Sequence, residues 1–168
     1  MSNVLVECVP NFSEGRNQEV IEAIVQPFRN KKGCRLVDYR ADKDHNRLVV
    51  SLVGDPHPIQ NALIEASLVA IEKIDLERHQ GGHPRIGAID VIPFIPIQNI
   101  DMKGCVDLAH TFGRRFYQAT RVPVYFYEEA ALRPERRQLE VIRKGQCDDG
   151  ARARRQDADD RRPLRRDA

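Results

Sequence analysis

Residues 78–96 join a polar, glycine-rich segment to a compact apolar run. The glycine pair Gly81-Gly82 lets the backbone bend where larger residues would clash. Pro84 restricts the residue before it, His83, to an extended conformation. The run from Ile86 to Phe94 is bounded by prolines, which cannot continue a ladder of hydrogen bonds, and it predicts a buried strand. We therefore expect a loop that carries reactive side chains and leads into a rigid strand.

His83 and Arg85 are the candidate reactive residues of this loop. An unshifted histidine has a pKa of about 6.5, so it can accept and return a proton near neutral pH. An arginine can hold a carboxylate through two parallel N–H groups. From the residues alone, His83 is equally consistent with a hydrogen-bonded loop histidine and with a general acid–base catalyst.

A metal site is a weaker interpretation of the same histidines. His79 and His83 have the i,i+4 spacing that suits a metal only when both lie on a helix. Gly81-Gly82 and Pro84 argue against a helix, so we expect no metal here. A structural metal site built from His45, His79 and His83 is the remaining alternative of this kind.

The whole segment 78–96 closely resembles the signature of glutamate formiminotransferases, the folate-dependent enzymes of histidine breakdown. Residues 6–15, Val-Glu-Cys-Val-Pro-Asn-Phe-Ser-Glu-Gly, are similar to the same family, and so is the Asn46-Arg47 turn. The similarity runs from residue 2 to residue 146. It covers only the N-terminal subdomain of that family.

The resemblance implies transfer of a formimino group between N-formimino-L-glutamate and tetrahydrofolate, with tetrahydrofolate as co-substrate. His83 is then the general acid–base, because one nitrogen must lose a proton and the departing nitrogen must gain one. Arg85 is the candidate for holding a carboxylate of glutamate or folate, and Arg47 is a second candidate. The resemblance adds four further residues that could bind substrate or folate: Asn11, Ser13, His45 and Asn46.

Several of these residues also have a purely structural interpretation. Asn11 and Ser13 are typical turn residues that satisfy local backbone groups. The polar segment 40–47 is equally consistent with a solvated connection between two strands. The family often has an acidic residue where this chain has Arg40, and a small backbone shift would let Asp42 take its place.

Apolar periodicity predicts alternating strands and helices. We expect strands at residues 4–9, 34–39, 48–53, 86–94 and 122–127. We expect one helix at residues 17–30 and a second from Asp55-Pro56 to Ile74. A third helix should carry the apolar stripe Cys105, Ala109, Phe112 and Phe116, with Asp101 or Asn99 as its cap. A fourth should begin at Glu128 and end at residues 143–145. This order predicts an α+β fold, a mixed sheet with helices mainly on one face and a ferredoxin-like flavour. The resemblance implies a comparable subdomain.

The 168 residues have room for one domain, which we place at residues 1–146. Residues 147–168 form a charged tail with no aromatic side chain and one leucine. Such a composition cannot offset the entropy of ordering, so we expect the tail to be disordered. Aspartates nearly balance arginines there, and the net charge of the chain is only +2. Nucleic-acid binding is therefore not predicted.

No apolar run approaches the roughly 20 residues of a membrane-spanning helix, and the N-terminal residues lack the pattern of a signal peptide. We expect a cytoplasmic protein that does not bind membranes. Cys8, Cys34 and Cys105 each lie in an apolar stretch. Free thiols behave there as small hydrophobic groups, so we expect reduced cysteines in the core.

A second class of function stays open beside catalysis. The family's substrates lie in a groove between two subdomains, and a ligand held on one wall alone loses much of its burial. The chain is then a non-catalytic subdomain, or one that depends on a partner. The candidate partners are a separately encoded second-subdomain polypeptide and a second copy of this chain, beside the small-molecule substrates themselves.

Overall fold

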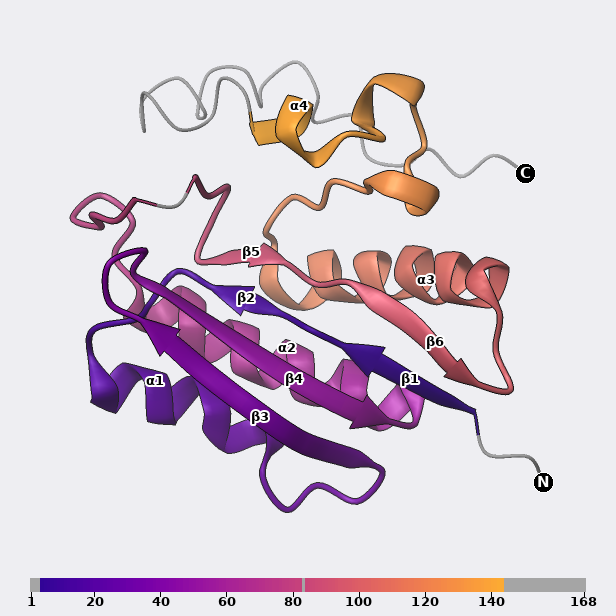
Figure 1. The fold of residues 1–168 in the computed structure, drawn as a ribbon, viewed down its shortest axis with the longest axis horizontal. Helices are drawn as coiled ribbons and strands as arrows, with labels where there is room; N and C mark the ends of the chain where they lie inside the picture. Colours follow the sequence, from indigo (N-terminus) through magenta and orange to yellow (C-terminus); the bar gives the residue numbers. More distant parts are fainter. Residues whose placement is uncertain (1–3, 83, 144–168) are drawn as a thin grey trace.

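The computed structural model describes residues 4–82 and 84–143 as one antiparallel sheet with helices packed against it (Figure 1). The strands are β1 (Leu5–Cys8), β2 (Asn11–Phe12), β3 (Cys34–Asp42), β4 (Arg47–Gly54), β5 (Ile89–Val91) and β6 (Phe94–Gln98). The α-helices are α1 (Gln18–Val25), α2 (Pro56–Lys73), α3 (Met102–Thr120) and α4 (Leu139–Arg143). Short 3-10 turns cover Gln26–Phe28, Glu128–Ala130 and Pro134–Arg136. The predicted α+β class is confirmed.

Strand β4 lies at the centre of the six-stranded sheet. The strand order is β5-β2-β4-β1-β6, and β3 pairs with β4 along its other edge. All strand pairs among the described residues are antiparallel, so the prediction of a mixed sheet is wrong. A short turn forces β3 and β4 to run in opposite directions. Strands β1 and β3 run in the same direction, but β4 lies between them and runs the opposite way. Strands β4 and β6 also run in the same direction, and β1 lies between them.

One face of the sheet is buried and the other is not. Leu48, Val50 and Leu52 of β4 are fully buried, whereas the residues between them are only partly buried. Side chains alternate between the two faces of a strand, so this pattern places the core on one side. Figure 1 shows α1 and α2 behind the sheet, on the side where that core lies.

The helix caps follow the sequence closely. Asn17 accepts hydrogen bonds from the backbone N–H groups of Glu19 and Val20 at the start of α1, and Asp101 accepts one from Gly104 at 2.8 Å at the start of α3. These bonds satisfy donors that a helix terminus leaves free. Of the two predicted caps of α3, Asp101 and Asn99, the structure therefore shows Asp101.

Two predicted helices are confirmed with changes at their ends. The stripe of α3 is buried at Cys105, Phe112 and Phe116, as expected. The helix predicted at 17–30 is shorter, because α1 ends at Val25 and Pro27 follows in a 3-10 turn. Proline has no N–H to continue the α-helical ladder.

The strand predicted at residues 86–94 is wrong in length and burial. It is divided into β5 and β6, which pair with β2 and β1 respectively, and β5 is only partly buried. Pro93 lies between the two short strands and cannot donate to a ladder, so the pairing is interrupted there. The dipeptide Asn11-Phe12, which was predicted as a turn, forms β2.

The strand predicted at residues 122–127 is also wrong. These residues have no regular secondary structure. They line a cavity together with α3 and the two short strands β5 and β6. A sequence rich in β-branched and aromatic residues forms a strand only where another strand is available to pair with it.

Two further expectations concern the ends of elements and of the chain. Strand β3 continues to Asp42, so Arg40 lies on a strand rather than in the loop. The predicted boundary at residue 146 and the charged tail 147–168 lie outside the described residues.

Between residues 4 and 143, apart from 83, no helix has both the length and the apolar composition that a membrane crossing requires.

Cys8, Cys34 and Cys105 are free and buried, which confirms the prediction of reduced core cysteines. Burial raises the pKa of the Cys8 thiol well above its usual value, and raises those of Cys34 and Cys105 as well. A thiol with a raised pKa forms little of the reactive thiolate. The packing role of these cysteines is therefore the one that the structure supports.

The central strand yields a stability prediction. Leu52→Ala removes a fully buried side chain from the middle of the core and should lower the free energy of unfolding by about 2–5 kcal/mol. Denaturant unfolding followed by circular dichroism measures the change. Leu68→Ala is the control, because Leu68 is 45% exposed on α2, and its effect should stay within about 0.5 kcal/mol. Equal effects of the two substitutions would contradict the placement of the core.

Candidate functional site

Three connections meet at one end of the sheet, at the left in Figure 1. They are the segment 13–17 between β2 and α1, the turn 43–46 between β3 and β4, and the segment 79–88 before β5. Hydrogen bonds join all three connections to one another. Most of the residues predicted to form the site lie in these connections, so the structure brings them together as one cluster.

Asn46 is the centre of this loop cluster. Its side chain is buried, with the residue only 7% exposed. Its Oδ1 accepts a hydrogen bond from the backbone N–H of Gly15 at 2.8 Å, and its Nδ2 donates to the carbonyl of Gln80 at 3.0 Å. Its φ of 48° lies in the left-handed region, which asparagine tolerates better than most residues. One side chain therefore joins all three connections.

Gly15 is needed because the turn approaches it closely. A Cβ atom there would lie 2.2 Å from the carbonyl oxygen of Asp42 and 2.6 Å from the backbone nitrogen of Arg47. Both are backbone atoms of the Asp42–Arg47 pair at the end of the β3–β4 ladder, which cannot move without breaking that pairing. A glycine is therefore required for the Gly15–Asn46 hydrogen bond to form.

Arg85 has its terminal nitrogens directed at the protein. Its Nη1 donates to His79 Nε2 at 3.0 Å, and its Nη2 donates to the carbonyl of His45 at 3.1 Å. His79 accepts through Nε2, and its Nδ1 is buried without a hydrogen-bond partner. Arg85 thus ties the loop to the turn, and its predicted contact with a carboxylate stays a prediction.

Ser13 and Asn11 contact the backbone. Ser13 Oγ donates to the carbonyl of Gly87 at 2.7 Å, and its N–H donates to the carbonyl of Ala88 at 2.9 Å. Asn11 Nδ2 donates to the carbonyl of Val9 at 3.1 Å. The Asn11 contact is the local backbone contact that the structural interpretation expected, whereas Ser13 bonds a segment 74 residues away in the sequence. A ligand contact by either residue stays a prediction.

His45 and Asp42 form a pair at the tip of the turn. His45 Nδ1 lies 2.6 Å from Asp42 Oδ2, and Asp42 Oδ1 accepts from the backbone N–H groups of Asp44 and His45. The backbone N–H of His45 and then its ring lower the pKa of the Asp42 carboxyl. Asp42 was considered as a substitute for the acidic residue that the family often has where this chain has Arg40. Its carboxylate instead accepts hydrogen bonds from the turn.

Arg47 keeps an unused donor. Its Nε is buried and has no hydrogen-bond partner. Arg47 precedes Leu48, which faces the helices, so the arginine points to the other, uncovered face of the sheet. A buried donor without a partner costs free energy. The predicted contact of Arg47 with a carboxylate stays a prediction, as it does for Arg85.

His83, the candidate catalytic residue, lies outside the described residues. The residue before it, Gly82, donates its N–H to the carbonyl of Asp44 at 3.3 Å. The described part of the loop is thus held against the turn up to this point. No group of three or more histidine, cysteine or acidic side chains in the described ranges is arranged to hold a metal ion.

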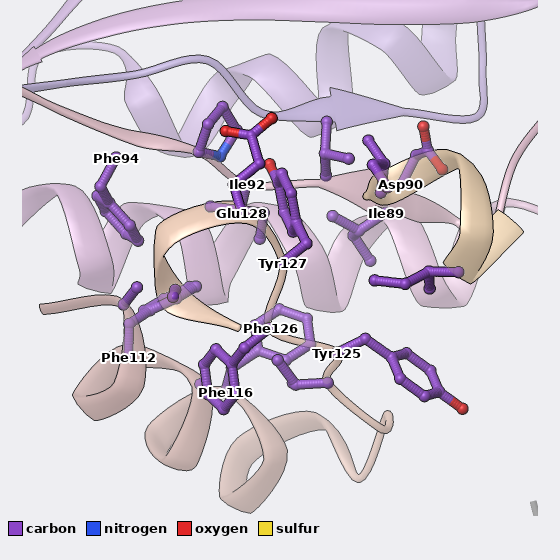
Figure 2. Close-up of a pocket in the computed structure, with 18 of the residues that line it drawn as sticks. Ile89, Asp90, Ile92, Phe94, Phe112, Phe116, Tyr125, Phe126, Tyr127 and Glu128 are labelled. Carbon is purple, nitrogen blue, oxygen red and sulfur yellow. The ribbon is translucent and has the colours of Figure 1, made fainter. Parts of the chain in front are cut away.

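A second feature is an apolar pocket of about 360 Å³. Figure 2 shows its wall of aromatic rings from β6, α3 and the segment 122–127. Sequence analysis did not predict this pocket. The two signals that could have found it are the phenylalanine stripe of α3 and the aromatic run 125–127, which share one apolar surface if the run is not a strand.

The wall of the pocket also carries acidic side chains. Asp90 of β5 is almost completely buried and forms an ion pair with Arg143 of α4, and it also accepts from the N–H of Ile86. Burial, together with the neighbouring carboxylate of Glu128, raises the pKa of Tyr127 to about 12. Tyr127 is therefore a neutral hydroxyl at physiological pH, and the charged side chains among the described residues of the wall are the carboxylates of Asp90, Glu128 and Glu129.

The fold and the loop cluster define an α+β domain whose candidate site is built from connections at one end of an antiparallel sheet. The chain belongs to the formiminotransferase family: the family model for the formiminotransferase domain, N-terminal subdomain, matches residues 5–163. The resemblance inferred from residues 6–15 and 78–96 is thereby confirmed.

Curated relatives carry names that agree with this assignment. The chain is 45% identical over 142 residues to the glutamate formimidoyltransferase of Streptococcus pyogenes, an alignment that covers 84% of this chain and 48% of the relative. It is 47% identical over 144 residues to the formimidoyltransferase-cyclodeaminase of Dictyostelium discoideum, with 86% of this chain and 27% of the relative covered. The chain thus spans about a quarter to a half of the length of these relatives.

The turn yields a pH prediction. Because the folded pKa of Asp42 is lowered, its contribution to stability is present above the unfolded pKa of about 3.9 and is lost as the pH falls through the lower folded value. Asp42→Asn should therefore be less stable than the unsubstituted chain at pH 6. The difference should begin to shrink as the pH falls below about 3.9 and should vanish only below the lowered folded pKa.

Thermal unfolding between pH 2.5 and 7 measures this effect. Asp38→Asn is the control on the same strand, because Asp38 pairs only with the exposed Arg40, and exposed ion pairs contribute little. A stability difference for Asp42→Asn that persists unchanged to pH 2.5 would show that the carboxylate charge is not what holds the turn.

Proposed function

We propose that this chain forms the N-terminal half of a glutamate formimidoyltransferase, which transfers a formimino group between N-formimino-L-glutamate and tetrahydrofolate. The observation that carries the proposal is the family match over residues 5–163. The 45% identity to a bacterial glutamate formimidoyltransferase supports it.

The reaction needs proton transfer at two nitrogens. A tetrahydrofolate nitrogen attacks the amidine carbon and forms a C–N bond, and the bond from that carbon to the glutamate nitrogen breaks. The attacking nitrogen loses a proton, and the leaving nitrogen gains one. We assign both transfers to His83, which as general acid–base would contribute roughly 10²- to 10⁴-fold to the rate.

We assign carboxylate binding to Arg47. The unused Nε of Arg47 and its place on the uncovered face of the sheet support this role. Arg85 is the second candidate, and its hydrogen bonds to His45 and His79 would have to be exchanged for a ligand. Asn11 on β2, Ser13 and His45 stay candidates for ligand contacts beside Arg47 and Arg85.

The chain needs a second wall to enclose its substrates. The relatives are at least twice as long as the aligned part, and a ligand bound on one wall alone is poorly buried. We therefore propose that a second-subdomain polypeptide completes the site. The alternative is that the isolated chain binds folate weakly and does not turn over, and a homodimer is a further candidate assembly.

The ferredoxin-like arrangement is also part of this proposal. It is supported by the order β6-β1-β4, with β3 beside β4, and by the connections through α1 and α2. The expected cytoplasmic location likewise stays a prediction.

The test uses a chimera in which this chain replaces the matching half of the Streptococcus pyogenes enzyme. With formiminoglutamate and tetrahydrofolate, the chimera should form 5-formimino-tetrahydrofolate. His83→Ala should lower kcat by about 10²-fold or more. His57→Ala is the control, because His57 is an exposed histidine at the start of α2, and its turnover should be unchanged.

Two outcomes would contradict the proposal. An inactive chimera whose circular dichroism shows a folded protein would argue against the function. Near-normal turnover of His83→Ala would leave the function standing and remove His83 as the acid–base. The isolated chain, assayed in parallel, distinguishes a catalytic subdomain from one that needs its second half.

A further inference from the structure

We propose that Asn46 is a positioning residue: it sets the backbone at Gln80–Gly82, immediately before His83, by tying it to the Gly15 turn. The catalytic part of this inference rests on the proposed function, in which His83 moves the proton. The structural part stands on the contacts of Asn46 alone.

The two ends of the Asn46 amide have partners that cannot be exchanged. Gly15 offers an N–H, so it must face the amide oxygen, and Gln80 offers a carbonyl, so it must face the NH₂ group. The orientation of the amide is thereby determined by its surroundings. Because Asn46 is buried, loss of either bond would leave an unsatisfied polar group.

The backbone conformation of Asn46 restricts which residues can replace it. Its φ of 48° excludes β-branched and most other side chains without strain. Aspartate, the closest replacement that tolerates this conformation, can still accept from Gly15, but its ionised carboxylate would repel the Gln80 carbonyl. Asparagine alone combines the left-handed conformation with one donor and one acceptor at this distance.

The partner segment is shaped to receive this contact. A Cβ on Gly81 would lie 2.5 Å from the His45 carbonyl oxygen and 2.8 Å from Asn46 Cβ. At Gly82 a Cβ would find only the Asp44 carbonyl at 4.0 Å. Gly81 is thus the point where the loop lies against the turn, while Gly82 has room for a side chain.

Two further bonds run parallel to the Asn46 contact. Gly82 N–H donates to Asp44, and Arg85 Nη2 donates to the His45 carbonyl. The turn 43–46 therefore holds the loop on both sides of residue 83 in sequence. Among these contacts only Asn46 also reaches Gly15, so it couples the part of the loop before residue 83 to the segment 13–17, while Ser13 joins the same segment to the end of the loop at Gly87 and Ala88.

This arrangement separates Asn46 from the ligand-binding role implied by the resemblance. Both polar ends of its side chain are already used by the protein, so a substrate would have to break a buried hydrogen bond to reach it. Its effect on the reaction must then pass through the loop. A displacement of about 1 Å in a catalytic group can cost about 10²-fold in rate.

The structural test measures amide hydrogen exchange at Gly82 by NMR in the 168-residue chain. Asn46→Asp should accelerate exchange at Gly82 about tenfold, the effect of one hydrogen bond, while the amide of Gly15 stays protected. Asn46→Gly, which fits the backbone but has no side chain, should accelerate exchange at both glycines. Asn30→Gly is the matched control, because Asn30 is exposed and has a similar φ of 53°, and it should change neither amide.

A steric pair provides a second measurement that involves no change at Asn46. Gly81→Ala should accelerate exchange at Gly82, because its new Cβ pushes the loop away from the turn. Gly82→Ala should leave the neighbouring Gly15 and His45 amides unchanged. If Gly82 exchanges at the same rate in Asn46→Asp, Asn46→Gly and the unsubstituted chain, the proposal is overturned.

The catalytic test uses the chimera described above. Asn46→Asp should lower kcat by about 10²-fold with KM for both substrates changed less than threefold, and the Asn30→Gly chimera should match the unsubstituted one. A rise in KM with kcat unchanged would instead make Asn46 a ligand-binding residue and overturn positioning. If the unsubstituted chimera is folded but inactive, the proposed function fails, and the exchange rates by themselves still decide the structural claim.

Discussion

The fold depends on strand β4, which is paired along both edges. On one side it pairs with β3 over its full length, and on the other it pairs with β2 near its start and with β1 near its end. Its alternate residues Leu48, Val50 and Leu52 contribute fully buried side chains to the core. A one-residue shift in register would move all of these side chains to the uncovered face. The position of every other strand is therefore determined relative to this one.

The candidate site lies where β4 begins, and this location has a physical consequence. The turn 43–46 is held by the β3–β4 ladder behind it and by the side chain of Asp42 at the end of β3, and the neighbouring loops contact it. Segments 13–17 and 79–88 have little regular structure of their own. They obtain their conformation from the turn, through Asn46 and through the close approach of Gly15 and Gly81. In this chain the loop cluster is thus held in place through the turn at the start of β4.

The apolar side of the molecule has a different character. The segment 122–127 and helix α3 place aromatic rings around a pocket instead of closing it, and the Asp90–Arg143 ion pair fastens α4 to β5 at its border. An almost completely buried carboxylate requires such a partner. Its presence shows that the last described segment packs specifically against the sheet, although it contains only a five-residue helix.

Local sequence by itself determined the elements whose signals are local: the alternation of β4, the caps at Asn17 and Asp101, the stripe of α3, and the membership of residues 6–15 and 78–96 in one family signature. It also picked out candidate site residues in polar connections next to strand ends, and the structure brings several of them together in one loop cluster. Only the tertiary structure decided which strands pair, why Pro93 divides one apolar run between β1 and β2, and why residues 122–127 form no strand. The same holds for Asn46, whose two hydrogen bonds reach partners 31 and 34 residues away. Such contacts depend on how distant segments meet, and a pattern of neighbouring residues does not contain that information.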